Sequence, residues 1–300
     1  MIADVDVVIP VRNGGRLLGE AVASVLDQEG VDVRVIVVDD GSTDGAPQRL
    51  RRDPRLTVLS GPAAGIPNAL NTGIAAGDAP YVARQDADDR SLPGRLSAEA
   101  EHLEAEPGIG LVATAFEVVV GDRAVATMGP APFGILERNP FCAGSTMVCR
   151  SVLAIAGGYR DAFRLSSDYD TWLRCAWVSG VTVLPVVGYR YRLTATMATI
   201  ARANAQAEFA TLARASARAR IAGDPDPVLC RVEVAERPQR DKERDDREVA
   251  AWWAREFAAL GARGEAWRCL RRAAPALSWR RKLALASHLV ARPEPQAVWR

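Results

Sequence analysis

Short apolar runs alternate with amphipathic stretches through the first hundred residues, and few folds accommodate that order. Four runs rich in Val and Ile have the length of strands and span residues 5–11, 33–40, 56–60 and 80–86. Between them, residues 15–28 and 66–77 carry apolar side chains at helical spacing. Strands that alternate with helices indicate a parallel sheet covered on both faces. Such a sheet binds its ligands beyond the carboxyl ends of the strands.

The pattern changes after residue 106. Residues 109–129 are expected to form a hairpin around Gly121-Asp122, because apolar alternation flanks that dipeptide. A further strand is expected within residues 144–150, followed by a helix from Ser151. Another helix is predicted from Asp168 to about Ser179, and two strands are predicted near residues 181–185 and 186–192.

From about residue 196 the chain is rich in Ala and Arg and shows no strand pattern. Residues 201–223 favour a helix that ends at Gly223. A later helix carries five apolar residues on one face: Val249, Trp252, Trp253, Phe257 and Leu260. These faces pack on the preceding α/β part of the chain or on a second subunit in one interpretation. In the other, an Arg-rich face with Trp279 and Leu283 lies on an anionic membrane.

The charge balance excludes few partners but does not favour nucleic acid. Thirty-eight basic and thirty-seven acidic residues leave a formal net charge of +1. The five cysteines form no CxxC pair, so we expect reduced thiols. The N-terminus carries Asp4 and Asp6 where a signal peptide would be positive, and no apolar run reaches the roughly 18 residues of a membrane span. We therefore expect a cytoplasmic protein.

Two acidic groups follow predicted strands, where an open sheet presents its ligand site. The first is Asp39-Asp40, whose carboxylates could accept hydrogen bonds from a nucleotide base or ribose. The structural alternative is that Asp40, Ser42 or Asp44 caps the next helix.

The second group is Asp86, Asp88 and Asp89, which lie within four positions. So much negative charge is unfavourable unless a cation or a ligand hydroxyl offsets it. Oxygen ligands suit Mg²⁺ or Mn²⁺. We expect Asp88 to bind the metal and Asp86 to share it or to bind ribose. The alternative is that Asp89 or Ser91 caps the helix that begins near Pro93.

The third group, Asp168 and Asp170, begins a predicted helix that carries Trp172 inward, after a Gly157-Gly158 turn that permits close backbone approach. The helix dipole stabilises the ionised form of an acid at this position. A carboxylate within reach of a hydroxyl can act as a general base. We expect Asp168 to be that base and Asp170 to cap or pack.

Taken together and in order, these segments resemble the family 2 glycosyltransferases of the GT-A fold. The matching segments are VVIPVRNGG, VIVVDDGSTD, QDADD, and GGYRDAF followed by SDYDTWLR, between about residues 5 and 192. The resemblance implies an α/β fold with a Rossmann-like, mostly parallel sheet flanked by helices. It implies a GT-A catalytic domain at residues 1–195, whose nucleotide-sugar half ends near 106 and whose acceptor half runs from about 107. A helical C-terminal region occupies residues 196–300.

The resemblance also implies an inverting transfer from a nucleotide diphosphate sugar to an acceptor hydroxyl. It favours UDP as the nucleotide, with dTDP or GDP as alternatives, and Mn²⁺ or Mg²⁺ as the cofactor. The donor-side residues are Pro10, Arg12, Asp40, Asp86, Asp88 and Arg192, with Asp86 and Asp88 as the DxD-type metal site. Asp168 takes the proton, and Gly158, Asp170 and Trp172 lie on the acceptor side. The acceptor is a saccharide, a lipid-linked molecule or a small molecule, as in the synthesis of cell-envelope polysaccharide.

Three positions depart from the family pattern. Arg12 stands where an aromatic residue is frequent, Ser167 replaces a Glu, and Thr194 replaces a His. Two alternatives remain, one from the sheet and its acids and one from Ser167 and Thr194. A nucleotidyltransferase would share the sheet and the metal, and would release pyrophosphate. An inactive module would bind the nucleotide sugar without turnover.

Overall fold

The structure is a computed structural model of the 300-residue chain. It describes residues 3–130, 134–195, 202–229, 249–251, 253–259 and 262–273. The strands are β1 (Ala3–Val11), β2 (Val31–Asp39), β3 (Leu56–Ser60), β4 (Tyr81–Arg84), β5 (Arg90–Ser91), β6 (Ile109–Val120), β7 (Arg123–Met128), β8 (Thr146–Cys149) and β9 (Gly180–Arg192). The α-helices are α1 (Leu17–Leu26), α2 (Ile66–Ala75), α3 (Arg95–Ala105), α4 (Arg150–Ala156), α5 (Ser167–Val178), α7 (Ala203–Ala222) and α9 (Arg263–Ala273). Two 3-10 turns span Pro47–Arg49 and Ala143–Ser145.

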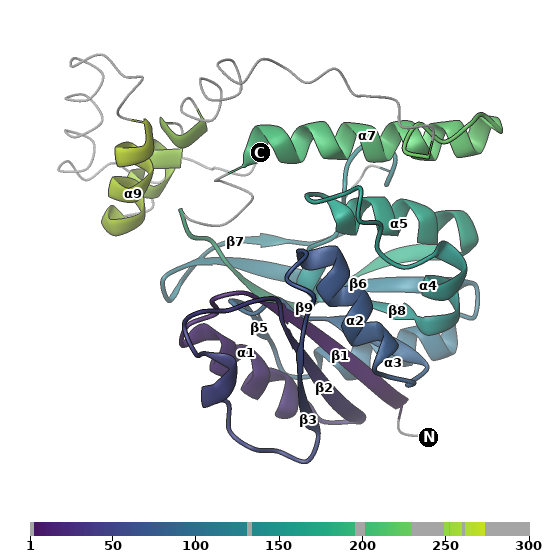
Figure 1. Cartoon of the computed structure of the whole chain (residues 1–300), viewed down its shortest axis with the longest axis horizontal. Coiled ribbons are helices and arrows are strands. Elements are labelled where there is room, and N and C mark those ends of the chain that lie inside the picture. Colours follow the sequence, from purple (N-terminus) through teal and green to yellow (C-terminus); the bar gives the residue numbers. More distant parts are fainter. Residues whose placement is uncertain are drawn as a thin grey trace.

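One sheet forms the centre of the molecule, with strand order β3-β2-β1-β4-β8-β6-β9-β5 and β7 paired to β6 (Figure 1). The pairs β1-β2, β1-β4, β2-β3 and β6-β9 are parallel. Strand β8 runs antiparallel to both of its neighbours, β4 and β6. The expected α/β fold with a mostly parallel sheet is confirmed.

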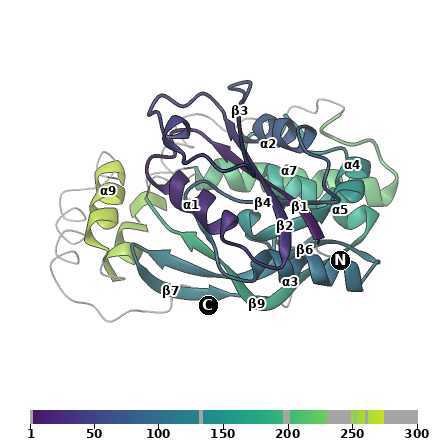
Figure 2. The same ribbon diagram turned by 90° about the horizontal axis from the view of Figure 1, so that it is seen from below.

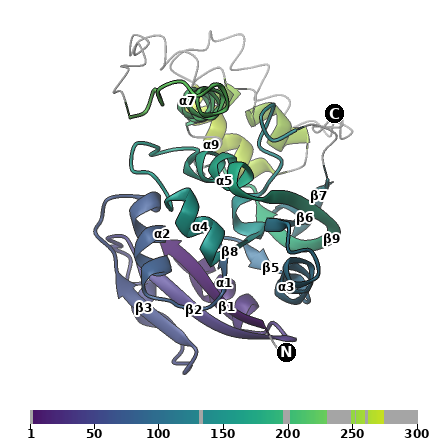
Figure 3. The same cartoon turned by 90° about the vertical axis from the view of Figure 1, so that its right-hand side faces the viewer.

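Helices cover both faces of this sheet because its central strands are apolar on both sides (Figure 3). In β1, Val7 and Ile9 point to the face covered by α1 and α3, where Leu18 and Leu96 join the core. Val8, between them, points to the opposite face, covered by α2, α4 and α5. The period of two along the strand therefore divides the core into two layers.

The C-terminal part that the structure describes is helical, with no strand after Arg192. Helix α7 packs on α5 through Ala213 and Ala217, which contact Phe163, Tyr169 and Leu173. Helical residues 249–251 and 253–259, together with α9, pack on the far end of β6 and β9 (Figure 2). Of the predicted apolar face, Trp253 and Phe257 are buried there. Trp252, Leu260, Trp279 and Leu283 lie outside the described residues. Across those same described segments, every helix is too short or too polar to cross a bilayer.

The structure differs from what the sequence indicated at three places. Residues 180–192 form one strand instead of two, because a bulge at Pro185-Val186 absorbs the break in pattern and pairing with β6 resumes at Val187. The two-residue strand β5 was not predicted. Helix α3 begins after Gly94 without a side-chain cap, so neither Asp89 nor Ser91 caps it. The expectation of free thiols holds for Cys142, Cys149, Cys175 and Cys269, and Cys230 lies outside the described residues.

Candidate active site

The predicted donor residues collect at the edge of the sheet where the carboxyl ends of β1, β2 and β4 meet. After β2 and β3 extend the sheet on one side of β1, helix α2 returns the chain to β4 on the other side. The loops that leave β1 and β4 therefore run in opposite directions. The space between two such loops is the usual place for a ligand in an open α/β sheet. Arg12 follows β1 and is exposed, and Pro10 pairs with Val38 at the end of the same strand.

Asp40 anchors the loop that precedes α2. Its buried carboxylate accepts hydrogen bonds from the backbone N–H groups of Ala64 at 3.1 Å and Gly65 at 2.8 Å. Gly65 is the N-cap residue of α2, which has no side-chain cap, so Asp40 fixes the loop that leads into the helix and does not itself cap it. Its contact with a nucleotide stays a prediction.

The loops after β1 and β2 are joined to each other. Asn13 donates its backbone N–H to the Ser42 hydroxyl at 2.9 Å and accepts the backbone N–H of Thr43 at 2.8 Å. Asp44 accepts the backbone N–H of Gly15 at 2.8 Å. These bonds fix the loop that begins at Arg12 against the loop that follows Asp40.

The acids after β4 differ in their surroundings. Arg84 pairs with Asp86, with 2.8 Å between Nη2 and Oδ1. Asp88 is half-buried, and burial together with the charge of Asp86 raises the pKa of Asp88 to about 6. Asp89 is fully buried and accepts the backbone N–H of Arg192 at 2.7 Å. Asp89 therefore builds the loop, whereas Asp86 and Asp88 remain as candidate ligands.

Asp86 and Asp88 fit a divalent cation. Both offer carboxylate oxygens, and the pKa of Asp88 is raised first by burial and then by the charge of Asp86, against the opposing charges of Arg192 and Arg84. Among the described residues, no group of three or more His, Cys, Asp or Glu side chains is arranged to hold a metal. Two carboxylates with phosphate oxygens and water as the remaining ligands are the arrangement that Mg²⁺ prefers.

Arg192, at the end of β9, reaches across this edge. Its Nη1 donates to the Asp88 carbonyl at 3.0 Å, and its Nη2 pairs with Oε2 of Glu20 at 2.6 Å. Arg192 thus ties α1 to the loop of the acids. Sequence reasoning missed Glu20, since an acid in the first turn of a helix usually signals only favourable helix electrostatics.

Asp168 lies in the first turn of α5 and faces the same region. Asn139 donates its side-chain N–H to Asp168 at 3.3 Å. Burial raises the pKa of Asp168, against the positive charge of Arg84, which lowers it, while the charge of Asp86 raises it further. Arg84 thus acts electrostatically on both acids, and the structure brings the predicted base and the predicted metal loop together. Sequence reasoning missed Arg84 and Asn139.

Asp170 is buried and bound by arginines. Its carboxylate accepts from Arg160, at 3.0 Å from Nε, and from Arg174, at 2.8 Å from Nη2. Arg160 also pairs with Asp226, after α7, at 2.8 Å. Asp170 therefore joins α5 to the C-terminal helices, which is the packing role expected for it.

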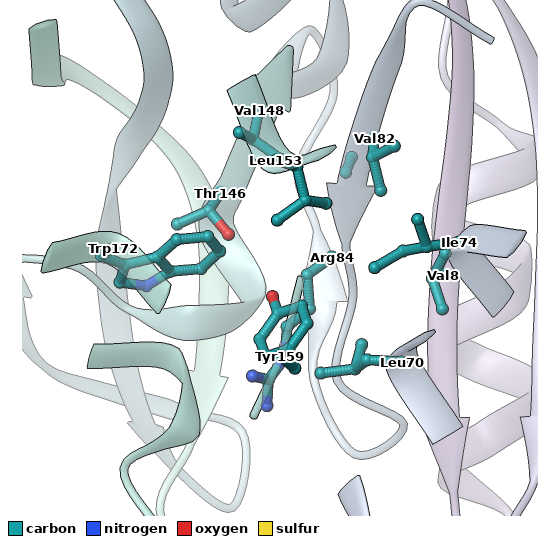
Figure 4. A pocket seen from close by; sticks show the side chains of 11 residues that line it. Val8, Leu70, Ile74, Val82, Arg84, Thr146, Val148, Leu153, Tyr159 and Trp172 are labelled. Atoms are coloured by element: carbon teal, nitrogen blue, oxygen red, sulfur yellow. The ribbon is translucent and has the colours of Figure 1, made fainter. Parts of the chain in front are cut away.

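Gly158 and Trp172, which were predicted to lie on the acceptor side, lie in the packed layer around Tyr159. Gly158 has a positive φ of 62°, and a Cβ there would lie 2.9 Å from Oδ1 of Asn71, which accepts the Tyr159 N–H. Trp172 is buried and meets Tyr159 edge-to-face at 6.0 Å. Figure 4 shows the Tyr159 ring beside Arg84 and the Trp172 ring farther to the left. These side chains line a void of about 10 Å³. Such a void has the size of one water molecule and excludes a substrate.

Comparison with known proteins gives concordant matches. The sequence profile of the family described as glycosyl transferase family 2 matches residues 6–150. The putative glycosyltransferase EpsE of Bacillus subtilis is 30% identical over 183 residues, which cover 57% of this chain and 66% of EpsE. The chain thus matches just under two thirds of EpsE.

Two solved structures share the fold at low sequence identity. Residues 1–349 of S. aureus TarS in complex with UDP-GlcNAc superpose with a TM-score of 0.55 at 15% identity, covering 95% of this chain and 90% of that one. The mannosyltransferase PcManGT from Pyrobaculum calidifontis, in complex with GDP-Man and Mn²⁺, gives 0.56 at 18% identity, covering 97% and 80%. The expected GT-A fold is confirmed.

Proposed function

We propose that this chain, which belongs to glycosyl transferase family 2, moves a sugar from a nucleoside diphosphate donor to an acceptor hydroxyl with inversion at the anomeric carbon. The observation that carries the proposal is that Asp168 lies close enough to Arg84 and Asp86 for their charges to act on its pKa, beside the loop that follows β4. A base and a cation-binding acid on opposite sides of one space are what an in-line displacement requires.

The donor is held on the side of β1 and β2. Asp40 and Arg12 lie at the carboxyl ends of these strands, where a base and ribose would sit, and a guanidinium can stack on a base. Asp86 and Asp88 would hold Mn²⁺ or Mg²⁺, which would neutralise the charge of the diphosphate. Arg192 offers a second positive charge to the same group once it leaves Glu20. UDP is the proposed nucleotide.

The chemical step transfers one proton and exchanges one bond. Asp168 accepts the proton of the acceptor hydroxyl, the acceptor oxygen forms a bond to the anomeric carbon, and the bond from that carbon to the diphosphate oxygen breaks. Burial favours proton uptake by Asp168, and Arg84 keeps the carboxylate ionised enough to accept it. Asn139 orients the carboxylate through its hydrogen bond.

A nucleotide-sugar screen tests this function. Thermal shift with UDP-, dTDP- and GDP-sugars, with and without Mn²⁺, identifies the donor, and the product released with saccharide acceptors is then measured. Release of a nucleoside diphosphate supports the proposal. Release of pyrophosphate indicates a nucleotidyltransferase. If the donor binds but is neither transferred nor slowly hydrolysed, the chain is an inactive binding module.

A further inference from the structure

Tyr189 of β9 lies completely buried behind the loop of acids. Its hydroxyl donates a hydrogen bond to Oδ2 of Asp89 at 3.1 Å. The hydroxyl oxygen of Tyr189 also accepts the backbone N–H of Asp86 at 3.2 Å and the side-chain N–H of Gln85 at 3.3 Å. One donor and two acceptor positions are all that a phenol has, so the group is fully used.

All three partners belong to one five-residue segment, Gln85–Asp89, which also contains Asp88. The hydroxyl holds the two ends of this segment at fixed positions relative to each other. This segment carries the carboxylates of Asp86 and Asp88, so the Tyr189 oxygen contributes to their separation, together with Arg84 and Arg192.

The Tyr189 ring is fixed from two sides. A Cβ on Gly144 would lie 1.9 Å from the Tyr189 hydroxyl oxygen, so only glycine leaves space for it. On the other side, the Arg95 guanidinium lies 5.2 Å from the ring centroid. Arg95 is itself buried and donates to the carbonyl of Arg84 at 2.9 Å. The ring cannot shift without disturbing the segment that it bonds.

We propose that Tyr189 is a positioning residue for the divalent cation, and this rests on the proposed function. It touches neither the cation nor the donor. Through the backbone of Asp86 and the carboxylate of Asp89, it presets the geometry in which Asp86 and Asp88 offer their oxygens. Hydrogen-bond partners of metal ligands are known to control metal affinity in this way.

The test is Tyr189→Phe, which removes one oxygen atom, and the readout is Mn²⁺ affinity. Isothermal titration with Mn²⁺ is carried out in the presence of UDP, with GDP as a second nucleotide. We expect the dissociation constant for Mn²⁺ to rise about 10- to 100-fold, while the affinity for the nucleotide without Mn²⁺ stays unchanged. A merely structural role would lower the melting temperature without this selective loss.

Tyr191→Phe is the matched control, because Tyr191 lies in the same strand and its ring packs edge-to-face on Phe116 at 6.1 Å. It should bind Mn²⁺ as the wild-type protein does. Gly144→Ala is the second variant, since its Cβ displaces the Tyr189 hydroxyl without removing it, and it should show the same loss. It carries the test if Tyr189→Phe does not fold.

The outcomes separate the two proposals. If the wild-type protein binds no Mn²⁺ in the presence of UDP and none in the presence of GDP, the proposed function is contradicted. A wild-type protein that binds Mn²⁺, together with folded variants of Tyr189 or Gly144 that bind it equally well, overturns the positioning role alone.

Discussion

Asp168 is the side chain on which the proposed chemistry depends most. Replacing it by Asn keeps its size and its ability to accept from Asn139, but removes the basic oxygen. We expect Asp168→Asn to lower the transfer rate by about 10²- to 10⁴-fold, the usual contribution of a general base. Donor affinity should stay at the wild-type value, because we propose that other residues hold the donor. Steady-state kinetics and titration with the donor measure the two quantities.

Asp161→Asn is the control for this variant. Asp161 is exposed in the loop before α5, so its charge is lost without a change at the site. Its rate should match that of the wild-type protein. Full activity of Asp168→Asn would remove the base assignment.

Asp88 makes cation binding depend on pH. Because its pKa is raised to about 6, Asp88 binds a proton more tightly in the folded protein without a cation than in the unfolded chain. The stability that this acid contributes is complete below the pKa of the unfolded chain, about 3.9, and is lost as the pH rises through about 6. A cation binds the ionised form and reverses that loss. The rise in melting temperature caused by Mn²⁺ and UDP should therefore be larger at pH 8 than at pH 5.

Below pH 6 the affinity for Mn²⁺ should fall about tenfold per pH unit, since one proton competes with the cation. In Asp88→Asn the Mn²⁺-dependent rise should be lost at every pH. An equal rise at pH 5 and pH 8 in the wild-type protein would show that Asp88 does not bind the cation.

Individual side chains were predicted where the pattern itself carries the chemistry. The clustered acids Asp86, Asp88 and Asp89 needed compensation in any fold, and that reasoning is independent of coordinates. Arg84 gave no such signal, because it occupies a buried strand position. Its partner Asp86 is near in sequence, but Asp168, whose pKa the charge of Arg84 lowers, comes close only in the folded structure.

At the scale of elements, Gly73 decides how closely α2 approaches the sheet. A Cβ there would lie 2.4 Å from Cγ1 of Val8 in β1 and 3.1 Å from Cγ2 of Val38 in β2. Helix propensity alone would make Gly73→Ala stabilising by up to about 1 kcal/mol. Overpacking costs about 1–3 kcal/mol and exceeds that gain. We expect a net loss of stability, measured by urea unfolding.

Gly19 in α1 is the matched control, because it is also helical and a Cβ there meets no atom within 4 Å. Gly19→Ala should stabilise the protein by about 0.5–1 kcal/mol. If both variants shift the free energy of unfolding in the same direction, the close contact of α2 with β1 is not limiting.

The elements themselves were predicted well where a long periodic pattern exists, as in β1, β2 and the helix α7 that ends at Gly223. They were predicted poorly where tertiary pairing makes the element. The strand β5 has only two residues and exists because Arg90 pairs with Arg190. In β9 the residue Pro185 predicted a break, yet pairing with β6 on both sides carries the strand across it.

At the scale of the whole molecule, the C-terminal helices are packed against the strand that leads into the donor site. Phe257 is fully buried with Val118 of β6 and Leu193, which directly follows Arg192. The backbone N–H of Ala195 donates to Oε2 of Glu265 in α9 at 2.7 Å. The end of β9 is therefore held from outside the sheet.

Phe257→Ala tests whether this packing supports the donor site. Removing the ring should cost about 3–5 kcal/mol, because the aromatic side chain fills a closed core. If the helices and the sheet unfold together, urea unfolding shows one transition at lower denaturant. Donor affinity should fall as well, since Leu193 loses its support and Arg192 beside it becomes less fixed.

Trp267→Ala is the control, because Trp267 is 45% exposed on α9, and its effect should stay within about 0.5 kcal/mol. Two separate transitions, with the sheet and donor binding unaffected by Phe257→Ala, would make the helices an independent unit. A single shifted transition with weaker donor binding would make them part of the catalytic fold.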